Sequence, residues 1–226
     1  MKKKAIIISI KGYQLTLKEQ DLIQNEKPWG LILFKRNIKS LTQVIQLTKK
    51  IRKLSKDSKF PVMIDEEGET VSRLERIINN NFSQKLFGDM YGFNPKTCLT
   101  FYKNYINNLS RILKKIGINI NTVPVLDVLR KNTNKIIGNR SFSSDPKVVK
   151  LLGKICVQQY KLNKIATVIK HIPGHGCSVL DSHVKTPEVN LKYKNLNNLD
   201  FLPFKSNTSI FAMTAHIVYS KIDKNN

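Results

Sequence analysis

Apolar runs alternate with amphipathic stretches along most of the chain. Short, nearly continuous apolar runs are typical of strands that are buried on both faces. We predict strands at 4–10, 30–34, 61–64, 117–128, 165–169 and 209–218. In stretches between them, apolar residues recur at intervals of three and four, which indicates helices that pack one face against a sheet. This alternation favours an α/β fold with a parallel sheet.

Several helices are predicted from signals at their starts. Thr16 and Ser40 are each followed three residues later by a glutamate or a glutamine, which is the pattern of a capping box. Asp145 stands before Pro146, so an aspartate N-cap precedes a proline at the first helical position. Apolar spacing alone predicts a further helix around 101–113.

Two arrangements of a parallel sheet remain open: a doubly wound sheet and a (β/α)8 barrel. Polar residues follow one predicted strand after another, namely Asp65, Asp127 with Arg140, the stretch from Lys170 to His183, and His216. A barrel builds its site from many successive strand ends, whereas an open sheet concentrates it at one switch point. The pattern favours a (β/α)8 TIM-barrel type, incomplete, with about six of eight β/α units present. No linker interrupts the chain, so we expect residues 1–226 to form a single domain.

Charge is the unusual feature of the composition. Lysine and arginine number 39 against 16 acidic residues, a net charge of +23 at pH 7. Such an excess suits nucleic acid, because lysines neutralise phosphates. The lysines are nevertheless spread along the chain, and no RNA-binding aromatic motif, helix-turn-helix pattern or glycine-rich phosphate loop is present. We therefore interpret the excess as a solvated surface and do not predict nucleic acid as the partner.

Location is predicted from the apolar runs and the cysteines. No run is long enough to span a membrane. The lysines and apolar residues after Met1 imitate a signal peptide, but Lys11 ends the run early and no cleavage site follows. Cys98, Cys156 and Cys177 match neither a zinc pattern nor a disulfide framework, which agrees with a reducing compartment. We expect a cytoplasmic protein with no membrane partner.

The histidines gather in the last quarter of the chain. His171, His175 and His183 share one glycine-containing stretch after the fifth predicted strand, and Asp181 comes two residues before His183. Imidazole titrates near neutrality, and a neighbouring carboxylate favours the protonated ring. Because loops on a rigid scaffold often carry function, this stretch indicates proton-transfer chemistry.

Two other interpretations of the histidine stretch stay open. It is a solvated turn with incidental histidines, or His171, His175, His183 and Asp181 form a metal site. The spacing between His171 and His175 crosses a proline and a glycine, so it lacks the helical zinc motif. We expect no metal and no cofactor.

The motifs of the chain, taken in order, resemble glycoside hydrolase family 3. They are Asp-Glu-Glu-Gly at 65–68, Arg-Leu at 73–74, Pro-Val-Leu-Asp at 124–127, Gly-Asn-Arg-Ser at 138–141, Lys-His-Ile-Pro-Gly-His-Gly at 170–176, Asp-Ser-His at 181–183 and Met-Thr-Ala-His at 213–216. Within the family, the chain is most similar to bacterial β-N-acetylhexosaminidases of cell-wall recycling. The resemblance implies a (β/α)8 barrel and retaining hydrolysis of terminal N-acetylglucosamine from peptidoglycan fragments.

The resemblance also implies residue roles. His183 matches the general acid/base and Asp181 its orienting partner, on the loop after the fifth strand. The positions that match sugar-binding residues are Asp65, Arg73, Arg140, Lys170 and His171. Carboxylates and cations of this kind hydrogen-bond sugar hydroxyls, although surface ion pairs or a helix cap would also account for each of them singly. The expected substrate is a muropeptide or oligosaccharide containing N-acetylglucosamine.

The chain departs from the family pattern in two places. Glu69 and Thr70 stand where the family usually has glycine and arginine, which adds a carboxylate near the expected pocket. The family nucleophile is an aspartate after the seventh strand, and Asp223 precedes that segment. We therefore expect the polypeptide alone to have little or no glycosidase activity. The alternatives are a noncatalytic sugar-binding remnant, half of a split enzyme whose partner is a complementing C-terminal fragment, and, less favoured, a basic nucleic-acid-binding protein.

Overall fold

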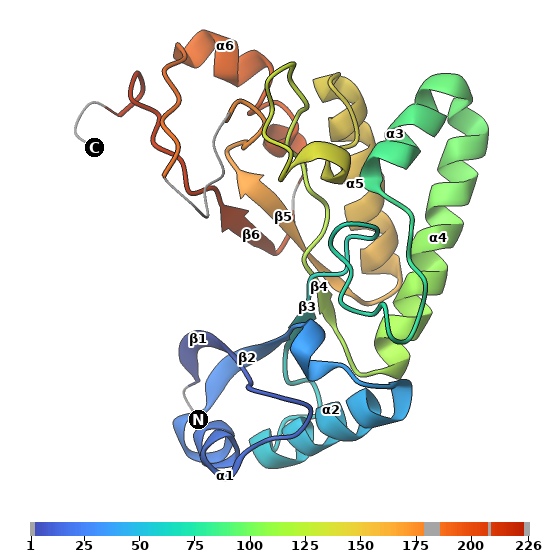
Figure 1. Ribbon diagram of the computed structural model, residues 1–226, viewed down its shortest axis with the longest axis vertical. Helices are drawn as coiled ribbons and strands as arrows, with labels where there is room; N and C mark the ends of the chain where they lie inside the picture. The colour runs from blue at the N-terminus through green and yellow to red at the C-terminus, as the bar shows by residue number, and fades with distance from the viewer. Residues whose placement is uncertain (1–2, 179–185, 208, 224–226) are drawn as a thin grey trace.

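The protein is built on a curled sheet of parallel strands. The computed structural model describes residues 3–178, 186–207 and 209–223. Its strands are β1 (Lys4–Ser9), β2 (Pro28–Leu33), β3 (Val62–Ile64), β4 (Ile120–Asn121), β5 (Ala166–Ile172) and β6 (Phe211–Thr214). They pair in chain order, each parallel to the next, and the sheet curls with its helices outside (Figure 1). A doubly wound sheet would reverse its order at a switch point, so the predicted incomplete barrel is confirmed.

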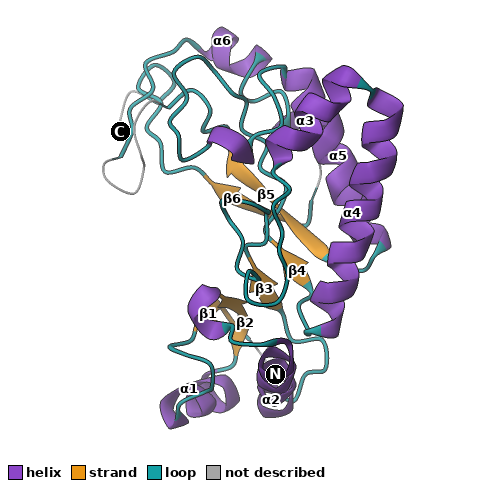
Figure 2. Cartoon of the chain, turned by 45° about the vertical axis from the view of Figure 1, so that its right-hand side comes forward, coloured by secondary structure: helices purple, strands orange, loops and turns teal. Residues whose placement is uncertain are grey.

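The helices of the described chain are α1 (Leu17–Asp21), α2 (Leu41–Ser55), α3 (Gln84–Phe93), α4 (Pro95–Lys115), α5 (Pro146–Leu162) and α6 (Tyr193–Asn198), with a π-helical turn at Leu22–Glu26. The long helices lie on the outer side of the sheet, whereas α6 lies among the loops beyond the strand ends (Figure 2). Among the described residues, no helix is both long and apolar enough to cross a membrane.

The predicted helix caps are present. The Thr16 hydroxyl accepts the backbone N–H of Glu19, and the Glu19 carboxylate accepts that of Thr16, which completes a capping box. Asp145 caps α5 as expected. Ser40 caps α2, but the Gln43 side chain accepts the N–H of Lys39 instead of that of Ser40. This second capping box is therefore only half formed.

Apolar side chains fill two layers. The larger one lies between the sheet and its helices and includes Leu31 and Ile64 from strands and Leu113 from α4, all fully buried. A smaller cluster lines the inside of the curl, where Trp29 of β2 meets Phe211 of β6 with ring centroids 5.3 Å apart. Since β2 and β6 are not neighbours in the sheet, this contact spans the barrel interior. Burial of these layers is the main stabilising contribution to the fold.

Strands β1 and β6 form the two edges of the described sheet. Each pairs with one described strand, β1 with β2 and β6 with β5. Most residues of β1 and β6 are exposed. An edge strand presents backbone N–H and C=O groups that can pair with another strand. The described part of the barrel is therefore open between β1 and β6.

Parts of the chain differ from the sequence prediction. The fourth strand is only two residues long, and just after it the N–H of Val123 donates back to the carbonyl of Asn121 at 2.9 Å instead of to a neighbouring strand. Extended chain continues beyond it and still contacts β5, since Leu126 donates to the carbonyl of Lys170 at 2.7 Å. Helices α3 and α6 were not predicted. A usable signal for α3 was Ser83, whose hydroxyl accepts the N–H of Leu86.

Candidate active site

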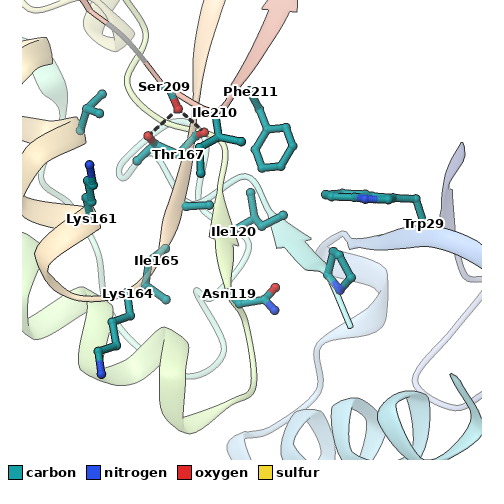
Figure 3. Close-up of a pocket in the computed structure, with 13 residues that line it drawn as sticks. Trp29, Asn119, Ile120, Lys161, Lys164, Ile165, Thr167, Ser209, Ile210 and Phe211 are labelled. Atoms are coloured by element: carbon teal, nitrogen blue, oxygen red, sulfur yellow. Dashed lines mark hydrogen bonds between the residues drawn. The ribbon is translucent and has the colours of Figure 1, made fainter. Parts of the chain in front are cut away.

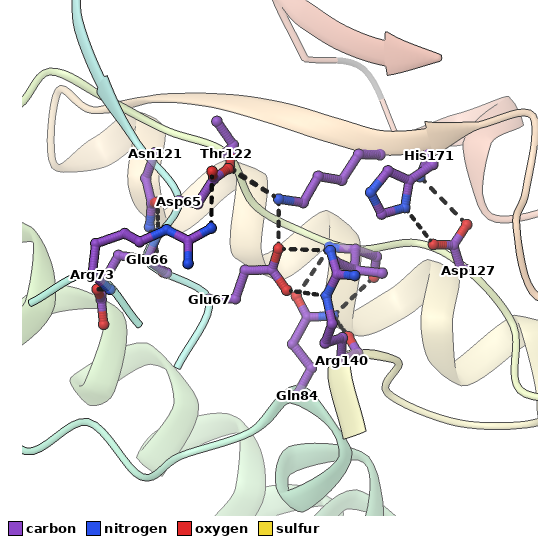
Figure 4. Close-up of polar contacts among 12 residues, drawn as sticks. Asp65, Glu66, Glu67, Arg73, Gln84, Asn121, Thr122, Asp127, Arg140 and His171 are labelled. Carbon is purple, nitrogen blue, oxygen red and sulfur yellow. Dashed lines mark hydrogen bonds and ion pairs between the residues drawn. The ribbon is translucent and has the colours of Figure 1, made fainter. Parts of the chain in front are cut away.

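The carboxyl ends of the strands carry the predicted sugar-binding residues. Asp65 directly follows β3, Lys170 and His171 lie near the end of β5, and Arg140 lies in the segment after β4. Arg73 comes from the loop that follows β3. Figure 4 shows that Asp65, Arg73 and Arg140 point toward a common region. The structure therefore brings residues that are far apart in sequence to one end of the barrel.

Five charged side chains form a chain of alternating sign. Arg140 contacts both carboxylate oxygens of Glu67, at 2.8 and 3.0 Å. Lys170 Nζ lies 2.5 Å from Glu67 Oε1 and 3.4 Å from Asp65 Oδ1. Arg73 Nη2 contacts the other Asp65 oxygen at 3.4 Å. The order is therefore Arg140, Glu67, Lys170, Asp65, Arg73, and each carboxylate lies between two cations.

Glu67 lies between Arg140 and Lys170 in this chain of charges, and no role was predicted for it from the sequence. Its side chain is 2% exposed. Burial alone would raise the pKa of Glu67, but the Lys170 ammonium and the Arg140 guanidinium outweigh this effect and lower it to about 2. The sequence signal was its position two residues after Asp65 in the same motif. Its neighbours Arg140 and Lys170 lie 73 and 103 residues further on, so only the fold reveals the contact.

Asp65 is the more accessible carboxylate. Its side chain is 14% exposed, and it accepts a hydrogen bond from the Thr122 hydroxyl. Lys170 also donates to Thr122, at 3.0 Å. Burial favours the neutral acid, yet Lys170, Thr122 and Arg73 together hold the pKa of Asp65 below its ordinary value. Asp65 is thus an ionised acceptor at neutral pH with room to meet a ligand hydroxyl.

Glu66 anchors the loop that carries Arg73. Its carboxylate accepts the backbone N–H groups of Arg73 and Leu74 at 2.7 and 3.0 Å. Ser72 and Asn80 donate to its other oxygen, at 2.9 and 2.6 Å. Burial raises the pKa of Glu66, and these hydrogen bonds offset the rise only partly. We interpret Glu66 as a structural carboxylate that fixes the position of Arg73.

His171 is oriented by a buried aspartate. Its Nδ1 lies 2.7 Å from Asp127 Oδ2, and Asp127 also accepts the backbone N–H of His175 at 2.7 Å. Burial would raise the pKa of Asp127, but the His171 ring and the two hydrogen bonds lower it below its ordinary value. Asp127 is fully buried, so the exposed part of this pair is the imidazole. The predicted sugar-binding residue His171 therefore presents an imidazole ring of fixed orientation to the site.

The first residues of the histidine stretch are held in place by hydrogen bonds. Thr133 donates to the carbonyl of Gly176 at 2.6 Å, and Tyr219 donates to that of Gly174 at 2.6 Å. The predicted catalytic pair, Asp181 and His183, lies outside the described residues. The structure therefore describes where this loop starts but does not test the role of either residue.

The close packing of Gly176 leads to a prediction. A Cβ atom on Gly176 would lie 1.8 Å from the Val128 carbonyl oxygen, so either the loop base or the chain after β4 must move. We expect Gly176→Ala to lower the free energy of unfolding by about 1–3 kcal/mol. Urea unfolding measures the change. Gly12→Ala is the control, because no atom lies within 4 Å of a Cβ there. Equal stability of the two variants would contradict the packing argument.

Glu69 lies at the rim of the site. It is exposed, and its backbone has φ of 44°, a left-handed conformation that glycine adopts more readily. Its carboxylate accepts a hydrogen bond from Asn139, the neighbour of Arg140, at 3.4 Å. Glu69, which replaces the usual family residue, thus places a carboxylate beside the five charged residues but forms no ion pair with any of them.

A hollow lies at the opposite, amino end of the strands. Its volume is about 650 Å³, and its lining is mainly apolar, with Trp29, Ile120 and Phe211 among its residues (Figure 3). None of its described lining residues is acidic or a histidine. It therefore lacks the groups for proton transfer, and we assign the chemistry to the carboxyl end.

Metal ligands do not cluster in the part of the chain that the structure describes. No group of three or more histidine, cysteine or acidic side chains there is arranged to hold a metal ion. The His171 and His175 rings have centroids 6.0 Å apart. The other two residues of the alternative metal site, Asp181 and His183, fall outside the described ranges.

Fold and site together define the class of the protein. It is a (β/α) barrel-type domain with a charged site at the carboxyl ends of its strands, the place where TIM-barrel enzymes hold their active sites. The sequence matches the family described as glycosyl hydrolase family 3 N terminal domain over residues 7–226. The chain belongs to this family, and the resemblance seen in the sequence is confirmed.

Known relatives support the same family. The chain is 32% identical to beta-hexosaminidase A of Pseudoalteromonas piscicida, over 90% of this chain and 35% of that protein. It is 30% identical to the beta-hexosaminidase of Xanthomonas euvesicatoria pv. vesicatoria (strain 85-10), over 96% of this chain and 65% of that protein. NagZ from Neisseria gonorrhoeae in complex with N-trifluoroacetyl-D-glucosamine superimposes with a TM-score of 0.87 at 27% identity, over 98% of this chain and 66% of that one. The chain thus spans between about a third and two thirds of these relatives.

Proposed function

We propose that the site binds a terminal N-acetylglucosamine and belongs to a retaining β-N-acetylhexosaminidase. The observation that carries this proposal is the alternating chain of charges. A sugar hydroxyl both donates and accepts hydrogen bonds, so it fits a site in which carboxylates and cations alternate. The partly exposed members, Asp65, Arg73 and Arg140, are the groups that would meet hydroxyls. The relatives named above and the analogue bound to NagZ support N-acetylglucosamine as the sugar.

Charge balance favours a neutral ligand over a phosphate. The two carboxylates of the charge chain, Asp65 and Glu67, each lie between two of its three cations, and nearby Asp127 pairs with His171. A phosphate-binding groove would instead offer cations without such partners. The overall charge of +23 therefore does not extend into the site as an unpaired positive patch.

The proposed chemistry assigns proton transfer to His183. Its imidazolium would protonate the glycosidic oxygen while a carboxylate attacks the anomeric carbon, and the neutral imidazole would then deprotonate water to release the sugar. Asp181 would orient the ring and favour its protonated form. Because no residue of this chain matches the family nucleophile, we propose that a complementing C-terminal segment supplies that aspartate.

The setting that we propose is the recycling of peptidoglycan fragments in the cytoplasm, with a muropeptide as substrate. The support is the resemblance to cell-wall recycling enzymes and the cysteine pattern, since an odd number of widely spaced cysteines is typical of a reducing compartment. The lysine excess of the chain would help to attract an anionic muropeptide.

The sugar proposal is tested by calorimetric titration of the chain with N-acetylglucosamine. We expect Asp65→Asn to weaken binding by about tenfold or more, because it removes a charged acceptor without changing its shape. Asp21→Asn is the matched control, since Asp21 is exposed on α1 and Asn would keep its contact with Asn25. Absence of sugar binding by the unsubstituted chain, or equal binding by both variants, would refute the proposed site.

The competing function is that of a basic nucleic-acid-binding protein. The net charge favours it, and the same titration separates it from sugar binding. Electrostatic binding to a polyanion would weaken steeply as salt increases and would not respond to Asp65→Asn. A noncatalytic sugar-binding protein would instead bind N-acetylglucosamine but remain inactive even when a C-terminal segment is supplied.

A further inference from the structure

Glu67 contacts two of the three cations of the charge chain. One carboxylate oxygen, Oε1, lies 2.5 Å from Lys170 Nζ and 3.0 Å from Arg140 Nη2. The other oxygen accepts the Arg140 Nε–H at 2.8 Å. One carboxylate thus joins a residue of β5 to a residue of the segment after β4. Among the contacts of these two cations, Glu67 is the side chain that both of them share.

The burial of Glu67 separates its role from that of a ligand-binding residue. Only 2% of its side chain is exposed, compared with 14% for Asp65 and 13% for Arg140. Both of its oxygens already accept hydrogen bonds from cations. A sugar at the mouth of the site would therefore meet Arg140 and Asp65 but not Glu67, and any effect of Glu67 on the sugar must pass through its neighbours.

The contacts of Arg140 leave a defined part of its guanidinium for a ligand. Nε and Nη2 each donate to Glu67, and Nη1 donates to the carbonyl of Ile136 at 3.0 Å. Because the guanidinium is planar and carries five N–H groups, three fixed contacts determine its plane and still leave donors on Nη1 and Nη2. The bidentate contact with Glu67 is therefore what aims these remaining donors.

Glu67 also sets the charge of the site. Lys170 is only 3% exposed. Without Glu67, Lys170 and Arg140 would remain near each other, and Asp65 would be the one carboxylate of the charge chain in contact with Lys170. Two cations so close to each other in a poorly solvated place repel strongly and attract an anion in place of the lost carboxylate. The carboxylate thus keeps the site suited to an uncharged ligand.

We propose that Glu67 is a positioning residue that aims Arg140 at the sugar, holds the buried Lys170 beside Asp65, and excludes anions from the vicinity of both cations. This inference rests on the proposed sugar-binding function. It predicts that removal of the charge alone changes the ligand preference of the site, whereas a residue that only supported the fold would affect every ligand alike.

The test compares the unsubstituted chain with Glu67→Gln and Glu67→Asp, after circular dichroism has shown that each is folded. Calorimetry measures the binding of N-acetylglucosamine and of inorganic phosphate. We expect Glu67→Gln to bind the sugar about tenfold more weakly and to gain phosphate binding that the unsubstituted chain lacks. Glu67→Asp keeps the charge but is one methylene shorter, so we expect weaker sugar binding without a gain of phosphate binding.

A double-substitution cycle tests whether Glu67 acts through Arg140. If it does, Glu67→Gln should weaken sugar binding much less in the Arg140→Gln background than in the unsubstituted chain. Additive effects, or unchanged sugar and phosphate affinities in Glu67→Gln, would overturn the inference. If Glu67→Gln does not fold, unchanged sugar binding by Glu67→Asp would overturn it. If the unsubstituted chain binds no sugar, the proposed function itself is wrong, so the two failures are distinguishable.

Discussion

The purified 226-residue polypeptide is expected to hydrolyse a chromogenic N-acetylglucosaminide at least about 10⁴-fold more slowly than a complete β-hexosaminidase. Retaining hydrolysis needs a nucleophile on one face of the sugar and a proton donor near the leaving oxygen. The chain offers the donor candidate His183, but no residue of it matches the nucleophile. In addition, the described barrel is open between β1 and β6, so water would reach the interior. Turnover at the rate of a complete relative would contradict this prediction.

A complementing segment should restore a large part of this loss. We expect activity to rise when a polypeptide with the last β/α units of a relative, including its nucleophilic aspartate, is expressed together with the chain. The exposed edges of β1 and β6 offer backbone groups with which the added strands can pair. The restored activity should vanish in His183→Ala and fall strongly in Asp181→Ala. Full activity of the complemented His183→Ala variant would show that the proton donor lies elsewhere.

Control variants separate loss of assembly from loss of chemistry. Leu17→Ala changes a side chain that is 84% exposed on α1, so complementation should be unaffected. A charged substitution in β6, Ala212→Asp, should instead hinder pairing at the edge and reduce copurification of the two polypeptides. The outcome against our proposal would be restored activity without any detectable association.

Local patterns were enough to predict most elements of the fold. Strands β2, β3 and β5 are short apolar runs that are buried on both faces, a pattern that leaves few alternatives. The N-caps Thr16 and Asp145 mark helix starts because their side chains bond backbone groups within the same turn. The order of the polar residues after successive strands was sufficient to favour a barrel over a doubly wound sheet.

The site residues were predicted from the resemblance of their motifs to the family, because each residue type alone also fits an ion pair or a helix cap. Asp65 and Lys170 were predicted in this way, and the structure brings them to 3.4 Å. Glu67 and Asp127 were quoted in motifs but received no role, because a buried carboxylate is recognised by the partners that the fold places around it. The short length of β4 was also not predicted, because it too depends on contacts made in the fold. The chain after β4 contacts β5 through only some of its backbone groups.

Acid should weaken the fold through Glu67. Its folded pKa of about 2 lies below the ordinary value of 4.5, so its stabilising contribution is complete above about pH 4.5 and is lost as pH falls toward 2. At about 1.4 kcal/mol per pKa unit, the contribution is about 3 kcal/mol. Asp65 and Asp127, whose pKa values are also lowered, act in the same direction. Glu66, whose pKa is raised, acts in the opposite direction and loses stability as pH rises.

Comparison with Glu67→Gln isolates this contribution from the opposing ones. Urea unfolding should show that the unsubstituted chain is the more stable of the two, with a difference about 3 kcal/mol smaller at about pH 2 than at about pH 7. Leu113→Ala is the control, because it opens a cavity in the core but removes no titrating group. Its difference from the unsubstituted chain should therefore stay constant with pH. If the Glu67→Gln difference were equally constant, Glu67 would not be the ionised member of the charge chain that holds Arg140 and Lys170, and Lys170 would have to be held in place by Asp65 and Thr122 instead.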